Sequence, residues 1–205
     1  MNSDDLTYKI YSDPNFVNKF FQQTKNIYNT NFYDRTETLK LFDNLQGKKV
    51  LDAGCGSGVY LEWLLEKEAL PTVVDYSLAM LEQVKAKYLN KIRLYHADLR
   101  EKLTFIDEEF DYILCAMVLL HIKDWNKTFK EFNRILKNNG ILIFSTVHPF
   151  ADISDENNYF DIEQVEEAWD FYNITMPSYR RPLEEIFKTI KETGFTILDL
   201  IEPKP

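Results

Sequence analysis

The chain has 205 residues, 45% hydrophobic and 15% aromatic, with a formal net charge of -9 at pH 7 and a pI near 4.9. This composition predicts one folded domain over residues 1–205 and excludes an extensively disordered chain. The acidic charge argues against a nucleic acid as partner, because phosphate backbones are bound by clustered Lys and Arg.

Other global features predict a soluble protein of the cytosol. The N-terminus lacks the basic flank and apolar core of a signal peptide, and the longest apolar run, YILCAMVLL, is far shorter than a membrane span. The two cysteines, Cys55 and Cys115, make no disulfide framework and have no partner at metal-ligand spacing. We therefore expect reduced thiols, no metal site and no contact with a membrane.

The first expected elements are helices. Residues 1–45 are expected to form a helical cap. Its first helix opens at Pro14 and carries an apolar stripe from Phe16 to Tyr28, and a second helix leads to Gly47.

From residue 46 on, strand patterns alternate with helical ones. Strands are expected over residues 48–53, 71–76, 92–97, 110–117, 140–147 and 195–202, and helices over 61–68, 77–89, 124–140 and 181–194. This alternation predicts right-handed crossovers and a doubly wound α/β fold, with a mainly parallel sheet covered by helices on both faces. The chain then divides into a core over 46–148, an insertion over 149–180, and a last helix and strand over 181–205.

A glycine-rich turn, VLDAGCGSG, follows the first expected strand, at the sheet edge where ligands bind in such folds. Gly54, Gly56 and Gly58 have the spacing G-x-G-x-G, whereas dinucleotide sites usually have G-x-G-x-x-G. A carboxylate such as Asp52, about 6 Å from a phosphate charge, would cost on the order of 3 kcal/mol at an effective dielectric near 20. S-adenosylmethionine carries an ammonium and a sulfonium and no phosphate. The turn therefore favours this cofactor over a nicotinamide dinucleotide, and a turn without a ligand is the alternative.

Two further acids follow expected strands. Asp75 ends the second strand and suits ribose hydroxyls, while Asp98 follows the third, in HADL, and suits the adenine amino group. Together with Asp52 they place acids at the ends of three successive strands. This arrangement indicates a nucleoside site rather than a solvated surface.

These segments resemble the class I S-adenosylmethionine-dependent methyltransferases, in particular small bacterial members with a short helical cap. The resemblance rests on VLDAGCGSG, VVDYSLAML, HADL, FDYILCAMVLLHIKDW and RILKNNGILIFSTVHPF, and covers the chain from about residue 30. It implies a Rossmann-like sheet of strand order 3-2-1-4-5 with the last strand beyond. It also implies a transferase of EC 2.1.1 type that uses S-adenosylmethionine and releases S-adenosylhomocysteine.

The resemblance further implies a set of cofactor contacts. These are Asp52, Gly54, Cys55 and Gly56 around the methionine part, Asp75, Tyr76 and Met80 around the ribose and adenine, Asp98 and Leu99 at the adenine edge, and the backbone of Cys115 and Ala116 at the amino group.

A general base is needed only if the acceptor arrives protonated. The candidates are His121, after the fourth strand, and His148, after the fifth; a structural role is the alternative for each. Similar sequences often carry histidine where this chain has Leu120, so the resemblance does not transfer a role to His121. We hypothesise that His148 lines the acceptor pocket.

Residues 149–180 are too many for an ordinary connection. Their aromatic residues could close over a small acceptor. Alternatively, Ile162, Val165, Trp169 and Tyr172, which have helical spacing, pack on the sheet.

Similar chains continue after EPKP into a seventh, antiparallel strand, and this sequence stops at Pro205. We expect the resulting sheet edge to promote self-association.

Taken together, the motifs favour a methyltransferase that acts on a small molecule, and they do not specify the acceptor. The alternatives are a protein that binds the cofactor without turnover, a methyltransferase of protein or RNA, and, least favoured, a nicotinamide dehydrogenase.

Overall fold

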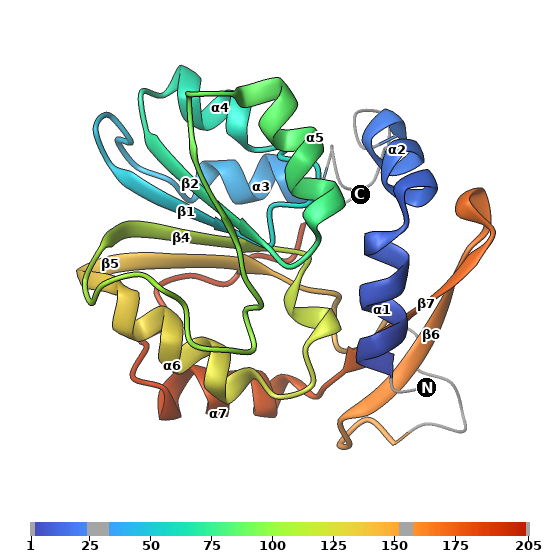
Figure 1. Cartoon of the computed structure of the whole chain (residues 1–205). Helices are drawn as coiled ribbons and strands as arrows, with labels where there is room; N and C mark the ends of the chain where they lie inside the picture. Colours follow the sequence, from blue (N-terminus) through green and yellow to red (C-terminus); the bar gives the residue numbers. More distant parts are fainter. Residues whose placement is uncertain (1–2, 24–32, 152–157, 204–205) are drawn as a thin grey trace.

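The computed structural model describes residues 3–23, 33–151 and 158–203. It contains a five-stranded sheet with helices on both faces and a separate two-stranded hairpin (Figure 1). The end of the expected apolar stripe, at Tyr28, lies outside the described residues.

The sheet has the order β3-β2-β1-β4-β5, and every pair in it is parallel. Its strands are β1 (Lys49–Ala53), β2 (Leu70–Asp75), β3 (Arg93–His96), β4 (Phe110–Ala116) and β5 (Leu136–Ser145). The central strands are buried almost throughout, as expected for a parallel sheet covered on both faces. The predicted fold class and the order 3-2-1-4-5 are confirmed.

The helices divide between the two faces of the sheet (Figure 1). One face carries α3 (Arg35–Lys40), α4 (Leu61–Glu66) and α5 (Leu78–Tyr88), and the other carries α6 (Trp125–Ile135) and α7 (Leu183–Glu192). Helix α5 begins where the sequence predicts, because the Ser77 hydroxyl accepts a hydrogen bond from the amide of Met80 at 3.1 Å. A separate apolar cluster fills the space between the sheet and each helix layer.

Two expectations for the sheet are wrong. Helix α6 ends at Ile135, not at Gly140, because the buried Leu136 already pairs with Phe110 as the first residue of β5. Residues 195–202 form no strand, although their sequence suits one. A strand needs a hydrogen-bonded neighbour, and within the described parts of the chain none pairs with this segment, so β5 lies at the edge of the sheet.

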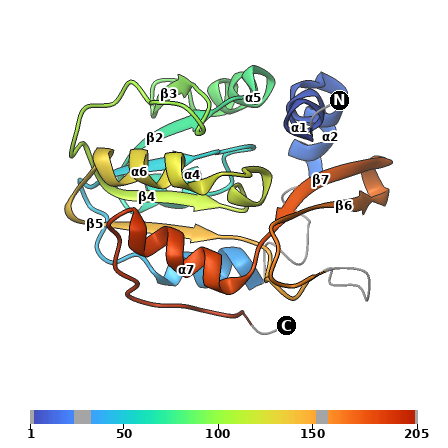
Figure 2. The same cartoon turned by 90° about the horizontal axis from the view of Figure 1, so that it is seen from below.

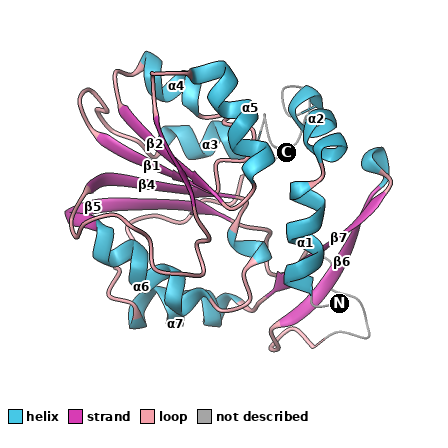
Figure 3. Cartoon of the chain, viewed as in Figure 1, coloured by secondary structure: helices cyan, strands magenta, loops and turns pink. Residues whose placement is uncertain are grey.

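Residues 163–180 of the insertion form a β-hairpin (Figure 3). Strand β6 (Glu163–Trp169) pairs antiparallel with β7 (Ile174–Arg180), and the 3₁₀ turn η3 (Asp170–Tyr172) forms the tip. The helical alternative is therefore wrong. The apolar residues do have helical spacing in the sequence. The conformation is decided instead by cross-strand pairing, as between Val165 and Ser178.

The N-terminal segment forms α1 (Ser3–Ser12), which the sequence did not predict, and α2 (Pro14–Gln23), which opens at Pro14 as predicted. Both helices lie with the hairpin beyond the carboxyl ends of the sheet strands (Figure 2). The ring of Phe16 on α2 lies 5.1 Å from that of Tyr172 at the hairpin tip. The two segments therefore meet above the sheet edge where a ligand is expected.

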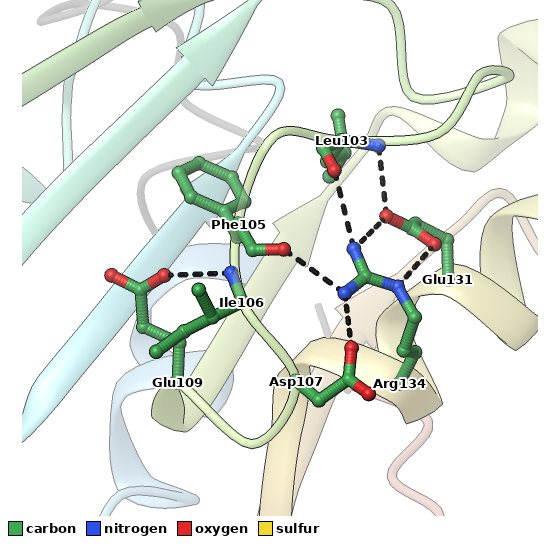
Figure 4. A network of polar contacts seen from close by, with 7 residues as sticks. All are labelled: Leu103, Phe105, Ile106, Asp107, Glu109, Glu131 and Arg134. Atoms are coloured by element: carbon green, nitrogen blue, oxygen red, sulfur yellow. Dashed lines mark hydrogen bonds and ion pairs between the residues drawn. The ribbon is translucent and has the colours of Figure 1, made fainter.

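A polar network fixes the loop between Asp98 and β4 (Figure 4). The guanidinium of Arg134 donates hydrogen bonds to the backbone oxygens of Leu103 and Phe105 and forms ion pairs with Asp107 and Glu131. Glu131 in turn accepts from the amide of Leu103 at 2.8 Å. One arginine on α6 therefore satisfies several groups of a loop that has no regular structure of its own.

We expect Arg134→Met to lower the free energy of unfolding by about 2 kcal/mol, because it leaves charge-assisted hydrogen bonds of the loop unmade. Urea denaturation measures this loss. Lys130→Met, which removes an exposed cation from the same helix, is the matched control. Equal stability of the two variants would contradict the role of the network.

Candidate functional site

A cavity of about 580 Å³ lies at the carboxyl edge of the sheet, within the size range of small-molecule sites. The loops after β1 to β4, the helices α1 and α2, and the hairpin tip contribute to its wall. The predicted site residues that line it are Asp52, Gly54, Cys55, Gly56, Asp75, Tyr76, Asp98, Leu99, Ala116 and His121. The structure thus brings most of the predicted residues to one place.

The glycines of the first turn have different surroundings. Gly54 has a positive φ of 78°, and a Cβ there would come within 2.5 Å of the side chain of Val118. Gly56 has a φ of 49°, and a Cβ there would meet only Phe20, at 3.9 Å. Gly54 therefore lets the loop after β4 pack closely, whereas Gly56 leaves open space at the cavity wall, where a ligand can approach the backbone.

Asp52 is a buried carboxylate without a full set of partners. Its side chain lines the cavity, the residue is only 2% exposed, and Oδ2 accepts no hydrogen bond from the described residues. Burial, together with the nearby charge of Asp75, raises the pKa of Asp52 to about 7. Such a group gains most from a ligand that brings a positive charge or a hydrogen-bond donor.

Arg35 is a second incompletely paired group on the same cavity, and sequence reasoning missed it. Its Nε is buried and donates to no acceptor among the described residues, while its guanidinium lies 5.7 Å from the ring centre of Tyr60. In the sequence it lies inside a segment that we interpreted only as a helical cap. The cavity thus contains incompletely paired groups of both signs, Asp52 and Arg35.

Asp75 is held in position by the backbone. Its Oδ2 accepts from the amide of Gly56 at 2.9 Å, and its Oδ1 accepts from the amide of Ser77 at 2.8 Å. Burial raises the pKa of Asp75, and the backbone hydrogen bonds oppose this rise. Since each carboxylate oxygen has two lone pairs, the two oxygens can still accept hydrogen bonds from a diol.

Asp98 already has a cationic partner. Arg100 donates to both of its carboxylate oxygens, with an Nη2–Oδ2 distance of 2.6 Å. Burial works against ionisation, but the side-chain and backbone hydrogen bonds from Arg100 prevail and lower the pKa of Asp98. The predicted contact of Asp98 with adenine remains a prediction, in which the carboxylate is shared with Arg100.

Three predicted residues do not line the cavity. Met80 packs with Phe16 in the apolar cluster near the hairpin, and Cys115 is fully buried in the main core. His148 is half-exposed, and its Nε2 lies 2.8 Å from Oε1 of Glu202. The hypothesis that His148 lines the acceptor pocket therefore has no support from its position.

His121 lies on the cavity wall in a chain of polar contacts. Its Nδ1 lies 3.1 Å from the carbonyl oxygen of Pro177 in β7, and its Nε2 lies 3.4 Å from the hydroxyl of Tyr11 in α1. A carbonyl can only accept, so Nδ1 carries the proton and Nε2 accepts from Tyr11. Burial lowers the pKa of His121 to about 4, so the ring is neutral at pH 7. Tyr11, which sequence reasoning missed, thus joins the cap to the hairpin through His121.

The hairpin supplies an aromatic and acidic part of the wall, namely Glu167, Trp169, Asp170, Phe171 and Tyr172. The indole Nε1 of Trp169 donates to Glu167 Oε2 at 3.1 Å. Phe150 and Phe160, other aromatic residues of the insertion, are exposed and do not line the cavity.

Comparison with known proteins finds similarity to one family over part of the chain. Residues 51–144 match the family described as "Methyltransferase domain". An uncharacterized protein of Haemophilus influenzae is 27% identical over 202 residues, which cover 93% of this chain and 80% of that protein. The ubiquinone biosynthesis O-methyltransferase of Histophilus somni is 33% identical over 113 residues, 52% of this chain and 48% of that protein. The chain therefore matches about half the length of that relative.

The fold also has solved counterparts. A candidate S-adenosylmethionine-dependent methyltransferase of Listeria monocytogenes superposes with a TM-score of 0.71 at 24% identity, over 83% of this chain and 87% of that one. At this identity the likeness shows the fold alone. Among the described residues, no helix is long and apolar enough to cross a membrane.

We expect the ring of His121 to stay neutral from pH 8 to about pH 5, as its pKa of about 4 requires. NMR titration of the ring protons measures this, with the exposed His96 and His148 in the same spectrum for comparison. In the unfolded chain the His121 side chain has the ordinary histidine pKa, near 6.5, so between about pH 6.5 and pH 4 the unfolded state binds one more proton than the folded state. The free energy of unfolding therefore falls as the pH drops through this range. His121→Gln should reduce this fall. A His121 midpoint above pH 6 would refute the assignment.

Proposed function

We propose that this chain, whose residues 51–144 match the methyltransferase-domain family, binds S-adenosylmethionine in the cavity and transfers its methyl group to a small acceptor. The observation that carries the proposal is the pair of incompletely paired groups, Asp52 Oδ2 and Arg35 Nε, on the wall of one cavity. The methionine part of this cofactor carries an ammonium and a carboxylate. The two groups have the charges that complement such a zwitterion.

The remaining residues fit the nucleoside part. Asp75 presents two oriented oxygens for ribose hydroxyls, and Gly56 leaves room for close approach to the backbone. A dinucleotide fits less well, because a pyrophosphate at this turn would lie near the carboxylates of Asp52 and Asp75. The cavity therefore favours an adenosyl cation over a nicotinamide dinucleotide.

The bound cofactor would supply an activated methyl group on a sulfonium sulfur. The chain's own contribution is positioning and exclusion of water. Asp52 and Arg35 hold one end of the ligand and Asp75 the middle, while the cap and the hairpin tip cover the site. Alignment of two reacting atoms can account for roughly 7 to 11 kcal/mol of a barrier, so no strong acid or base is required by this scheme. The neutral His121 is consistent with this, since its low pKa makes it a weak base.

Isothermal titration calorimetry with S-adenosylhomocysteine and with NAD tests the proposal. We expect binding of the first and none of the second. Arg35→Gln should weaken the binding of S-adenosylhomocysteine roughly ten- to a hundredfold, because a charge-assisted hydrogen bond contributes about 1.5 to 3 kcal/mol. Lys40→Gln removes an exposed cation of the same helix and should leave the affinity unchanged. Binding of NAD alone, or equal effects of both variants, would refute the proposed site.

The affinity should also depend on pH through Asp52. In the ligand-free protein the pKa of this carboxyl is about 7, and the ammonium group of a bound ligand would stabilise its ionised form. Below pH 7 the protein must first release that proton, so binding of S-adenosylhomocysteine should weaken by up to tenfold per pH unit. Asp52→Asn should bind less tightly at pH 8 and lose this dependence. An unchanged pH profile in Asp52→Asn would contradict the role of Asp52.

A further inference from the structure

The cavity wall has an excess of negative charge. Among the described residues that line it, the acids are Asp34, Asp52, Asp75, Asp98, Glu167 and Asp170, and the cations are Arg35 and Arg100. Arg100 is paired with Asp98, and Arg35 follows Asp34 directly in the chain. The excess therefore lies with Asp52 and Asp75 at the glycine turn and with Glu167 and Asp170 on the hairpin.

The hairpin end of the cavity is both acidic and aromatic. Trp169, Phe171 and Tyr172 line it, and the hydrogen bond from Trp169 places the Glu167 carboxylate beside the indole. The buried hydroxyl of Tyr172 has no hydrogen-bond partner among the described residues. Aromatic faces attract cations, and carboxylates at their edge strengthen this attraction. The hairpin end of the cavity therefore favours a ligand with an apolar body and a positively charged or hydrogen-bonding group.

On the basis of the proposed function, we propose that the acceptor is a small amine with an aromatic or apolar body, bound near Glu167 and Asp170 and methylated on nitrogen. The name of the Histophilus somni relative, an O-methyltransferase, indicates an oxygen acceptor for that protein, whereas we propose a nitrogen acceptor for this chain.

The charge balance of the transfer supports nitrogen. The bound ammonium first releases one proton to water. The lone pair of the resulting neutral amine then attacks the methyl carbon, the carbon–sulfur bond breaks, and its electrons stay on sulfur. The positive charge thus moves from sulfur to nitrogen and remains inside a negative cavity, and the methylated ammonium can then lose one proton to water. A phenolate or carboxylate acceptor would instead enter against Glu167 and Asp170 and leave no cation behind.

A matched pair of probes tests the inference by binding. Phenethylamine and 3-phenylpropionate have similar bodies and opposite charges at pH 7. Titrated into protein saturated with S-adenosylhomocysteine, phenethylamine should bind at least tenfold more tightly, and added salt should reduce the difference. Equal affinities, a preference for the carboxylate, or no binding of either probe would overturn the inference.

Variants identify the groups responsible. Glu167→Gln combined with Asp170→Asn should remove most of the preference for phenethylamine. Glu166→Gln removes an exposed carboxylate from the same strand that does not line the cavity, and it should keep the preference. A preference unchanged in the double variant, or lost equally in Glu166→Gln, would overturn the inference.

Turnover and cofactor binding separate this inference from the proposed function. With S-adenosylmethionine, phenethylamine should gain one methyl group on nitrogen, detected by mass spectrometry, and should react faster than 4-ethylphenol does on oxygen. Faster reaction of the phenol would overturn the amine assignment but keep the methyltransferase. Failure of S-adenosylhomocysteine to bind the unmodified protein would instead refute the proposed function itself.

Discussion

The structure depends on two buried carboxylates, Asp52 and Asp75, which lie near the carboxyl ends of neighbouring strands and influence each other electrostatically. Charges in a poorly hydrated site are costly unless donors or cations surround them. The fold satisfies Asp75 with the amides of Gly56 and Ser77 and leaves Asp52 incompletely paired. A glycine turn that bends back towards β2 supplies the first of these amides. The same backbone geometry therefore stabilises one carboxylate and keeps the other available for a ligand.

The cavity above these carboxylates is completed by segments far apart in the sequence. The cap contributes Tyr11 and Arg35, and the hairpin contributes Trp169 and Tyr172. Tyr11 and the carbonyl of Pro177 contact the two ring nitrogens of His121, so one neutral imidazole bridges the cap and the hairpin. The ends of the sheet strands thus form one part of the cavity wall, and the cap and the hairpin form another part.

Much of this arrangement could be predicted from local sequence signals. Strand and helix periodicity gave the α/β fold class, and the resemblance to a known family gave the sheet order. The glycine turn with Asp52, Asp75 and Asp98 marked the sheet edge at which the cavity lies, because the ends of parallel strands meet there. Arg35 and Tyr11 could not be predicted in this way, since tertiary packing alone brings their segments to the cavity. The hairpin was ambiguous because its apolar residues also fit helical spacing. The strand expected over residues 195–202 had a suitable pattern, but a pattern does not supply a hydrogen-bonded neighbour.

The close fit between Gly54 and Val118 links two positions that are distant in the chain. A methyl group at position 54 would occupy the space of the valine side chain, so the loop after β4, which continues to His121, would have to shift. A family that keeps this loop in place should inherit the two residues as a pair. A homologue with a bulkier residue at position 118 should then require glycine at position 54, so the substitutions tolerated at either position depend on the residue at the other.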